Sequence, residues 1–174
     1  DVHPYVLMNF NGSYGDVSTY AHEWGHSIHS MLTAENQPYP TSDYSIFTAE
    51  VASTTNEQLL VDRMIRQAKT PEDKLFYIGQ ALEAIRGTYF RQAQFAEFEL
   101  AIHRAAENGE QLSGDRLTQK YGEILRKYYG VDQGITAIDE TDYAEWAYIP
   151  HFYYDFYVYQ YATSITAGQV FAQG

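Results

Sequence analysis

The stretch "AHEWGHSIHS", residues 21–30, holds three of the 6 histidines in this chain of 174 residues. His22 and His26 are four residues apart, and Glu23 directly follows the first histidine. On an α-helix, side chains with this spacing lie on one face and one turn apart, so both imidazoles can reach a single ion. This is the H-E-x-x-H pattern, in which two histidines bind zinc and the glutamate acts as a general base. The stretch therefore predicts a helix that carries a metal site.

A catalytic zinc needs a third protein ligand and an open position. His29 lies on the same helix face as His22, but seven residues correspond to roughly 10.5 Å of rise, too far for three histidines to share one ion. A second type of metal site, the di-iron helical bundle, needs two E-x-x-H units. The sequence holds one such unit, Glu23-x-x-His26, which disfavours that interpretation.

The third ligand is expected from the next helix, across the turn "ENQPYPTSD". The candidate carboxylates are Glu35, Asp43, Glu50 and Glu57. The first two flank the turn, where a carboxylate is ordinarily solvated. Glu50 lies in the largely uncharged stretch "FTAEVASTTNE", so it needs a partner. We therefore choose Glu50 as the third metal ligand, with Glu57 and also Ser53 as outer-shell support for the histidines.

Composition narrows the possible functions. The net charge of −12, from 11 Lys and Arg against 23 Asp and Glu, works against binding nucleic acids or anionic membranes. The absence of cysteine restricts metal ligands to histidine and carboxylate, and it fits a reducing compartment such as the cytoplasm. No apolar run reaches the roughly 18 residues of a membrane span, and no signal peptide is visible. The chain starts at Asp1 without Met and ends in "VFAQG", so we expect a fragment of a longer protein.

The hydrophobic pattern predicts a mainly α fold with a short N-terminal edge strand. The first helix is expected to be N-capped by Asp16 or Ser18 and to bury an apolar stripe that includes Trp24, Ile28 and Met31. The other elements are an edge strand at 5–10, a helix at 44–68, a helix from Pro71 to Glu107 capped by Thr70 and bent near Gly79 or Gly87, a helix within 112–129 closed by Gly130, a short helix within 140–152, and a buried helix over 153–172.

The segment "IPHFYYDFYVYQYA", residues 149–162, is unusually rich in aromatic side chains. If it is helical, Tyr154, Tyr157 and Tyr161 share one face, while Tyr153 and Tyr159 point elsewhere. Tyrosine hydroxyls and histidine can donate hydrogen bonds to the oxyanion that forms during peptide hydrolysis. The alternative is that these rings belong to the core and that their hydroxyls reach water or backbone.

Three separated blocks of the sequence together resemble one known family. They are "NFNGSYGDVSTYAHEWGH", "FTAEVASTTNEQLL" with Glu50 placed 24 residues after His26, and "IPHFYYDFYVYQYATS". These blocks resemble the M3 family of zinc metallopeptidases, and within it the oligoendopeptidase F branch. The resemblance implies a zincin-type, largely helical metallopeptidase with a deep channel that admits short peptides and excludes folded proteins.

The resemblance also implies roles for individual residues. Zinc is expected on His22, His26 and Glu50, with Glu23 as the catalytic carboxylate. A substrate-contacting pair falls on His151 and Tyr161, with Tyr154 beside it. Members of the family are several times longer and carry an N-terminal helical portion. We therefore expect residues 1–174 to form a catalytic region that lacks this portion and the family's C-terminal end.

The predicted function is zinc-dependent endopeptidase activity on short peptides. Glu23 is the general base, and His151 and Tyr161 stabilise the oxyanion. The alternatives are a non-catalytic helical module with a structural zinc, a metal-free peptide-binding scaffold, or a region that is inactive without the rest of the channel. A structural zinc site fills all four positions and needs no base beside the metal, so Glu23 favours catalysis.

Overall fold

The computed structural model describes residues 3–174, and within them the chain is mainly helical, as predicted. The α-helices are α1 (Tyr14–Asn36), α2 (Ile46–Gln67), α3 (Pro71–Ile85), α4 (Arg91–Glu107), α5 (Gly114–Tyr129) and α6 (Tyr159–Gln173). The remaining elements are the 3-10 helices η1 (Tyr39–Thr41), η3 (Glu140–Tyr148) and η4 (Pro150–Tyr153) and the π-helical turn η2 (Arg86–Phe90). None of the helices in this part of the chain combines the length and apolarity that a membrane crossing requires.

The predicted edge strand at residues 5–10 is wrong. These residues have no regular structure, and the structure holds no strand anywhere in residues 3–174. A single extended segment needs a neighbouring strand for its backbone hydrogen bonds, and an α-helical chain offers none. The side chain of Leu7 is 98% exposed, so the apolar character of the segment does not reflect burial in this chain.

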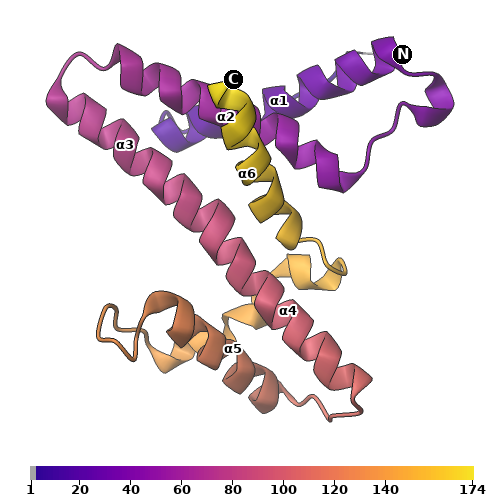
Figure 1. Cartoon of the computed structure of the whole chain (residues 1–174), viewed down its shortest axis with the longest axis vertical. Helices are drawn as coiled ribbons and strands as arrows, with labels where there is room; N and C mark the ends of the chain where they lie inside the picture. The colour runs from indigo at the N-terminus through magenta and orange to yellow at the C-terminus, as the bar shows by residue number, and fades with distance from the viewer. Residues whose placement is uncertain (1–2) are drawn as a thin grey trace. The chain divides into compact units, whose positions relative to one another are not determined.

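The chain forms two compact units. In the described residues, the first unit comprises residues 3–89 and 163–174, and the second unit comprises residues 90–162. In the first unit, α1 and α2 pack against each other, and α3 also contacts α2 (Figure 1). The end of the chain packs on α2, where the Thr54 hydroxyl donates a hydrogen bond to the Ser164 carbonyl over 3.1 Å.

The first helix begins earlier than predicted. Its N-cap is Ser13, whose hydroxyl accepts from the backbone N–H of Asp16, while the Asp16 carboxylate accepts from the backbone N–H of Ser13 over 2.8 Å. This reciprocal capping box makes Asp16 the third residue of the helix and leaves Ser18 without a capping role. The hydrogen bonds from Ser13 hold the pKa of Asp16 below its usual value.

The apolar stripe predicted for the core lies at the surface. Trp24, Ile28 and Met31 are 39%, 47% and 44% exposed, whereas the buried residues of α1 are Gly25 and Ser27. The side of α1 that is buried in this chain is therefore built from small residues. Small residues allow two helix backbones to approach closely, which a stripe of large side chains prevents.

Residues 71–107 follow the prediction closely. Thr70 caps α3 and Pro71 occupies its first turn, as expected. The helical path continues to Glu107 through the π turn of residues 86–90, so the predicted irregularity lies at Gly87 and not at Gly79. Such single π turns carry one extra residue within an otherwise regular helix.

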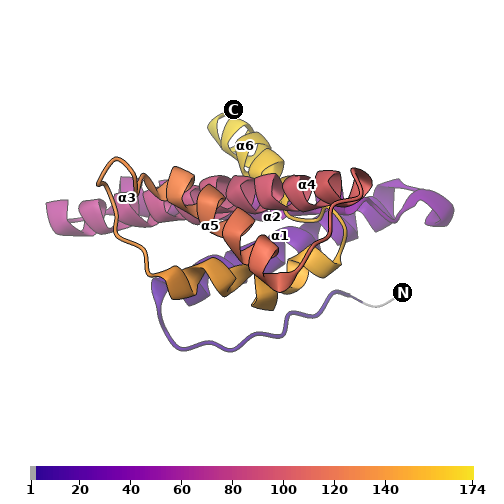
Figure 2. The same ribbon diagram turned by 90° about the horizontal axis from the view of Figure 1, so that it is seen from below.

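The second unit contains the aromatic core of the chain. Phe98 and Tyr121 are fully buried, with ring centroids 5.2 Å apart, and they join α4 to α5. In Figure 2 these two helices lie beside each other. The other members of the core cluster are Phe95, Ile124, Leu125 and Val158. Gly130 ends α5 in the left-handed region with φ of 63°, as predicted.

The last predicted helix is wrong in its start and in its burial. The structure begins α6 at Tyr159, because Asp155 and Phe156 adopt left-handed φ values of 43° and 56° and interrupt a helical path. Near the other end, Val170 and Phe171 are 65% and 66% exposed. The helix is therefore shorter than expected and only partly buried.

Candidate metal centre

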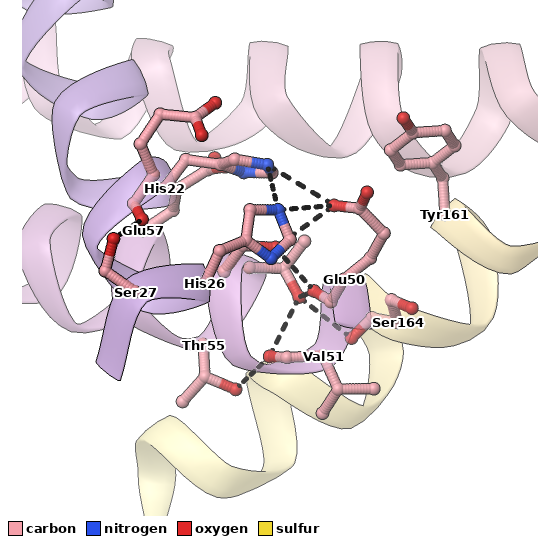
Figure 3. Close-up of polar contacts among 12 residues, drawn as sticks. His22, His26, Ser27, Glu50, Val51, Thr55, Glu57, Tyr161 and Ser164 are labelled. Atoms are coloured by element: carbon pink, nitrogen blue, oxygen red, sulfur yellow. Dashed lines mark hydrogen bonds and ion pairs between the residues drawn. The ribbon is translucent and has the colours of Figure 1, made fainter. Parts of the chain in front are cut away.

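His22 and His26 project from α1 toward Glu50 on α2 (Figure 3). The Nε2 atoms of the two histidines are 3.2 Å apart. Glu50 Oε2 lies 3.3 Å from His22 Nε2 and 3.6 Å from His26 Nε2. Glu50 is only 7% exposed, so its carboxylate faces the histidines from within the first unit. One point between these three side chains can be reached by a donor atom from each.

The close approach of α1 and α2 has a local cause at Gly25. A Cβ atom at this position would lie 2.6 Å from Ser53 Cα and 2.8 Å from the Ala52 carbonyl oxygen, closer than real side chains approach. Gly25 lies between the two histidines in sequence, and Ser53 lies one turn after Glu50. Because Gly25 has no side chain, α1 and α2 can approach closely at this point, and the three ligands come together.

A second layer of polar groups supports the three side chains. His22 Nδ1 is hydrogen-bonded to Glu57 Oε1, which orients the ring so that Nε2 faces Glu50. The Ser53 hydroxyl donates to Glu50 Oε2 over 3.1 Å. The sequence predicted that Ser53 supports the histidines. In the structure this hydroxyl instead contacts the carboxylate, because it lies on the same helix as Glu50 and one turn away.

The charges in the site depend on each other. Burial lowers the pKa of His22, but its hydrogen bonds to Glu50 and Glu57 outweigh burial and raise that pKa to about 10. Burial raises the pKa of Glu50, but the hydrogen bonds to His22 and Ser53 and the charges of the two histidines together outweigh burial, so the net shift is downward. A proton on His22 therefore balances the carboxylates in the absence of a cation, and a divalent metal can take over that balance.

The donor set fits zinc. Two imidazole nitrogens and one carboxylate oxygen, all within 4.8 Å of one another, are a ligand combination that catalytic zinc sites use. Within residues 3–174, His22, His26 and Glu50 are the potential metal ligands that lie close enough together, as a group of three or more, to bind one ion. Of the rejected candidates, Glu35 and Asp43 are exposed, and His29 stacks on Tyr44 with ring centroids 3.9 Å apart.

Glu23 lies on the wall of a cavity of about 460 Å³ that also reaches His22 and Glu57. The cavity is formed by α1, α2 and α3 of the first unit. Its other lining residues include Tyr14, Ser18, Thr19, Gln58, Gln80 and Glu83. The Glu23 side chain is thus adjacent to the histidine pair without belonging to the group of three, and it faces a space that solvent can enter.

Four ring side chains between residues 151 and 161 contact one another in the second unit. The His151 ring stacks on Tyr157 with centroids 5.4 Å apart, and it meets the Tyr154 and Tyr161 rings edge-on at 6.3 Å. The hydroxyls of Tyr157 and Tyr161 are hydrogen-bonded at 3.3 Å. We call His151, Tyr154, Tyr157 and Tyr161 the ring cluster.

The ring cluster forms for a different reason from the one predicted. Tyr154 and Tyr157 precede α6, so a shared helix face cannot bring them to Tyr161. The left-handed residues Asp155 and Phe156 fold the chain so that rings before and after them meet. Phe156 is unusual in this conformation, and neither glycine nor asparagine marks the turn in the sequence. Tyr153, expected to point elsewhere, is 73% exposed.

The fold and the site together define a helical protein with a candidate metal site, formed by an H-E-x-x-H motif on one helix and a carboxylate ligand candidate on the next. The sequence matches the model of peptidase family M3 over residues 1–173. The chain belongs to this family.

Similar proteins agree with this assignment. The chain is 48% identical over 166 residues to oligopeptidase PepF of Bacillus subtilis, covering 95% of this chain and 24% of that protein. It is 45% identical over 174 residues to the chromosomal oligoendopeptidase F of Lactococcus lactis subsp. cremoris, covering 99% and 28%. The crystal structure of oligoendopeptidase-F from Enterococcus faecium superposes with a TM-score of 0.72 at 38% identity, covering 91% of this chain and 28% of that one. The chain therefore spans about a quarter of the length of these relatives.

Proposed function

We propose that this chain provides the catalytic region, over residues 1–174, of a zinc-dependent endopeptidase that hydrolyses short peptides. The observation that carries the proposal is the group formed by His22, His26 and Glu50, with Glu23 on the cavity wall beside it. The names of the relatives, oligopeptidase and oligoendopeptidase, support short peptides as the substrate class. The net charge of −12 disfavours nucleic acids and anionic membranes as partners, and the lack of cysteine fits the cytoplasm.

His22, His26 and Glu50 would hold the zinc ion. When bound, zinc in such a site polarises the carbonyl of the bond to be cut and makes a water molecule more acidic. The protein's part is to fix the ligands, and the hydrogen bond from His22 to Glu57 and that from Ser53 to Glu50 support this role.

Glu23 is the general base in this proposal. Its carboxylate accepts a proton from the attacking water and later delivers it to the departing amine. Its place on the wall of the cavity, directly after His22 in sequence, supports this role because the group must be within reach of the water without binding the metal. Glu57, which also lies beside His22 on the cavity wall, is already hydrogen-bonded to the imidazole and is suited to orienting it.

His151 and Tyr161, with Tyr154 beside them, complete the proposal as donors to the oxygen of the scissile carbonyl. The family motif assigns a substrate-contacting histidine and tyrosine to this segment, and the three side chains are members of the ring cluster. Neutral hydroxyls and a histidine N–H are suitable donors because negative charge develops on this oxygen during attack.

A structural zinc is the rival function. Such a site fills all four coordination positions with protein ligands. The described residues bring three ligands together. No further histidine or carboxylate among these residues lies close enough to occupy a fourth coordination position. This arrangement favours a catalytic site with an open position.

Replacing Glu23 with glutamine tests the proposal. Glu23→Gln should keep zinc and lower peptide cleavage by about 10²–10⁴, because glutamine cannot accept the proton of the water. The matched control is Glu35→Gln, an exposed carboxylate on the same helix, which should leave cleavage unchanged. Zinc content by mass spectrometry and the rate on an internally quenched peptide are measured in the full-length protein. Near-normal cleavage by Glu23→Gln would contradict the assignment of the base.

A further inference from the structure

Glu99 on α4 is a buried carboxylate that the proposed mechanism does not use. It is 1% exposed and has the fully buried Phe98 as its neighbour in the chain. Burial raises its pKa, although the hydrogen bond from the Phe156 backbone acts in the opposite direction. A buried carboxylate costs stability unless it is well paired, so its presence calls for a specific partner.

That partner is the backbone of the aromatic segment. The N–H of Phe156 donates to Glu99 Oε1 over 2.6 Å. Phe156 is one of two residues, with Asp155, that have a left-handed φ without being glycine in the described chain. The left-handed conformation is sterically unfavourable for a residue with a side chain, and such residues persist only where the surroundings hold them.

Further contacts hold the same turn from α4 and from the core. The Phe156 ring lies against His103, one helical turn after Glu99, with centroids 4.4 Å apart. Val158, two residues later, is fully buried in the core of the second unit. The hydrogen bond to Glu99 is the shorter of two side-chain contacts on the Phe156 backbone, whose carbonyl also accepts from Gln160 Nε2 over 3.5 Å.

The turn separates the two halves of the ring cluster. His151 and Tyr154 precede it, while Tyr157 and Tyr161 follow it. The contact between His151 and Tyr157, at 5.4 Å, therefore depends on the path of the chain through Asp155 and Phe156. A change in that path would therefore move these rings apart.

We propose that Glu99 is a positioning residue, which fixes the turn at Asp155 and Phe156 and thereby arranges the ring cluster for contact with a bound peptide. The peptide contact rests on the proposed function, whereas the control of the turn does not. Glu99 touches neither the peptide nor the metal ligands in this proposal. Its effect reaches the substrate through Tyr157 and its ring contacts.

Two substitutions separate positioning from simple packing. Glu99→Gln keeps an oxygen that can accept from Phe156 N–H, whereas Glu99→Leu fills similar space without an acceptor. Glu97→Leu is the matched control, because Glu97 lies on the same helix but pairs with Lys127 outside the core. All three variants are made in the full-length protein, and zinc content and thermal unfolding are recorded for each.

The first measurement does not depend on activity. Hydrogen exchange of the Phe156 amide, followed by NMR after selective ¹⁵N-phenylalanine labelling, should accelerate at least about tenfold in Glu99→Leu. It should stay close to the wild-type rate in Glu99→Gln and Glu97→Leu. Unchanged exchange in Glu99→Leu would overturn the proposal, since the turn would then be held without this carboxylate.

The second measurement is steady-state cleavage of a quenched peptide. Glu99→Leu should lower kcat/KM by about tenfold to a hundredfold at unchanged zinc content, and glutamine should restore it, because small displacements of positioned groups have effects of this size. Equal losses in Gln and Leu variants, or wild-type kinetics in both, overturn the proposal. A wild-type protein that neither binds nor cleaves the peptide refutes the proposed function and the peptide contact, and the exchange experiment alone then decides the role of Glu99 in the turn.

Discussion

At the scale of single residues, Glu50 distinguishes this chain from a helix that merely carries two histidines. A histidine pair at i and i+4 on a partly exposed helix needs no metal to be stable. A carboxylate that is 7% exposed and lies 3.3 Å from His22 Nε2 does need a positive partner. The sequence indicated this residue through its uncharged surroundings, which is the signal that a buried carboxylate leaves in a sequence.

Among single side chains, Tyr161 is expected to affect the rate of catalysis through its hydroxyl. If its hydroxyl donates to the carbonyl oxygen of the substrate, Tyr161→Phe should lower kcat by about 10²–10³, or about 2.7–4 kcal/mol, with KM and zinc content almost unchanged. The reason is that the hydrogen bond strengthens as charge develops in the transition state. Steady-state kinetics of the full-length protein provide the measurement.

The matched control for Tyr161 is Tyr159→Phe, a tyrosine on the same helix that is 43% exposed. It should leave kcat unchanged. Tyr157 is the competing donor, because its hydroxyl is hydrogen-bonded to that of Tyr161 at 3.3 Å. A large loss in Tyr157→Phe together with normal turnover in Tyr161→Phe would assign the role to the other hydroxyl.

At the scale of helices, the packing of α1 on α2 depends on Gly25. Gly25→Ala would place a methyl group 2.6 Å from Ser53 Cα, and neither backbone can move aside without changing the distance between the helices. We expect a loss of about 1–3 kcal/mol in the free energy of unfolding and at least about tenfold weaker zinc binding. Denaturant unfolding and zinc titration measure the two effects.

Gly79→Ala is the control for this packing prediction. Gly79 lies within α3, and a Cβ there would meet no atom within 4 Å. Alanine should therefore stabilise the helix by about 0.5–1 kcal/mol and leave zinc binding unchanged. Similar destabilisation by both substitutions would show that the close approach at Gly25 is not what matters.

The capping box of α1 gives a pH-dependent prediction. Hydrogen bonds from Ser13 lower the pKa of Asp16 in the folded chain, so the unfolded chain binds more protons in the interval below the usual value of 3.8. The stabilisation is therefore present above that interval and is lost as the pH falls through it. Asp16→Asn keeps an acceptor but removes the charge at the helix N-terminus.

Asp16→Asn should accordingly unfold at a lower temperature than the wild type at neutral pH, and the difference should shrink as the pH falls below 3.8. Thermal unfolding followed by circular dichroism measures this difference. Asp115→Asn in the first turn of α5 is a suitable comparison, because Asp115 is also in a first turn but has no capping-box role. A difference that stays constant with pH would contradict a role for the Asp16 charge.

The helices also show what the sequence can and cannot predict. Helix ends at these positions were predicted correctly from adjacent residues. Thr70 and Pro71 start α3 and Gly130 ends α5, because a helix cap depends on a few neighbouring residues. The H-E-x-x-H pattern indicated two candidate ligands by their local spacing, and the uncharged surroundings of Glu50 indicated the third. Trp24 and Met31 were predicted to lie in a buried stripe of the first helix, but both are exposed, because the hydrophobicity of a side chain does not determine whether another element covers it. The left-handed turn at Phe156 is held by Glu99, 57 residues away in the sequence, so no local pattern could indicate it.

At the scale of the whole molecule, the division into two units separates the metal ligand candidates from the aromatic core. His22, His26 and Glu50 belong to the first unit, while the buried cluster around Phe98 and Tyr121 belongs to the second. A ligand that binds only the folded state stabilises the part of the protein whose unfolding would release it. The effects of zinc can therefore be confined to one unit.

Zinc should slow backbone hydrogen exchange in α1 and α2 but not in α5. At a free zinc concentration of about 100 times the dissociation constant, the first unit gains about 2.7 kcal/mol, which corresponds to roughly hundredfold slower exchange through openings that release the metal. Glu50→Gln should abolish this effect, and Glu35→Gln, on an exposed residue, should preserve it. Exchange measured by mass spectrometry with and without a chelator compares the helices within a single sample. Equal slowing in α5 would mean that the two units open together, and no slowing in α1 would mean that these three side chains do not bind zinc.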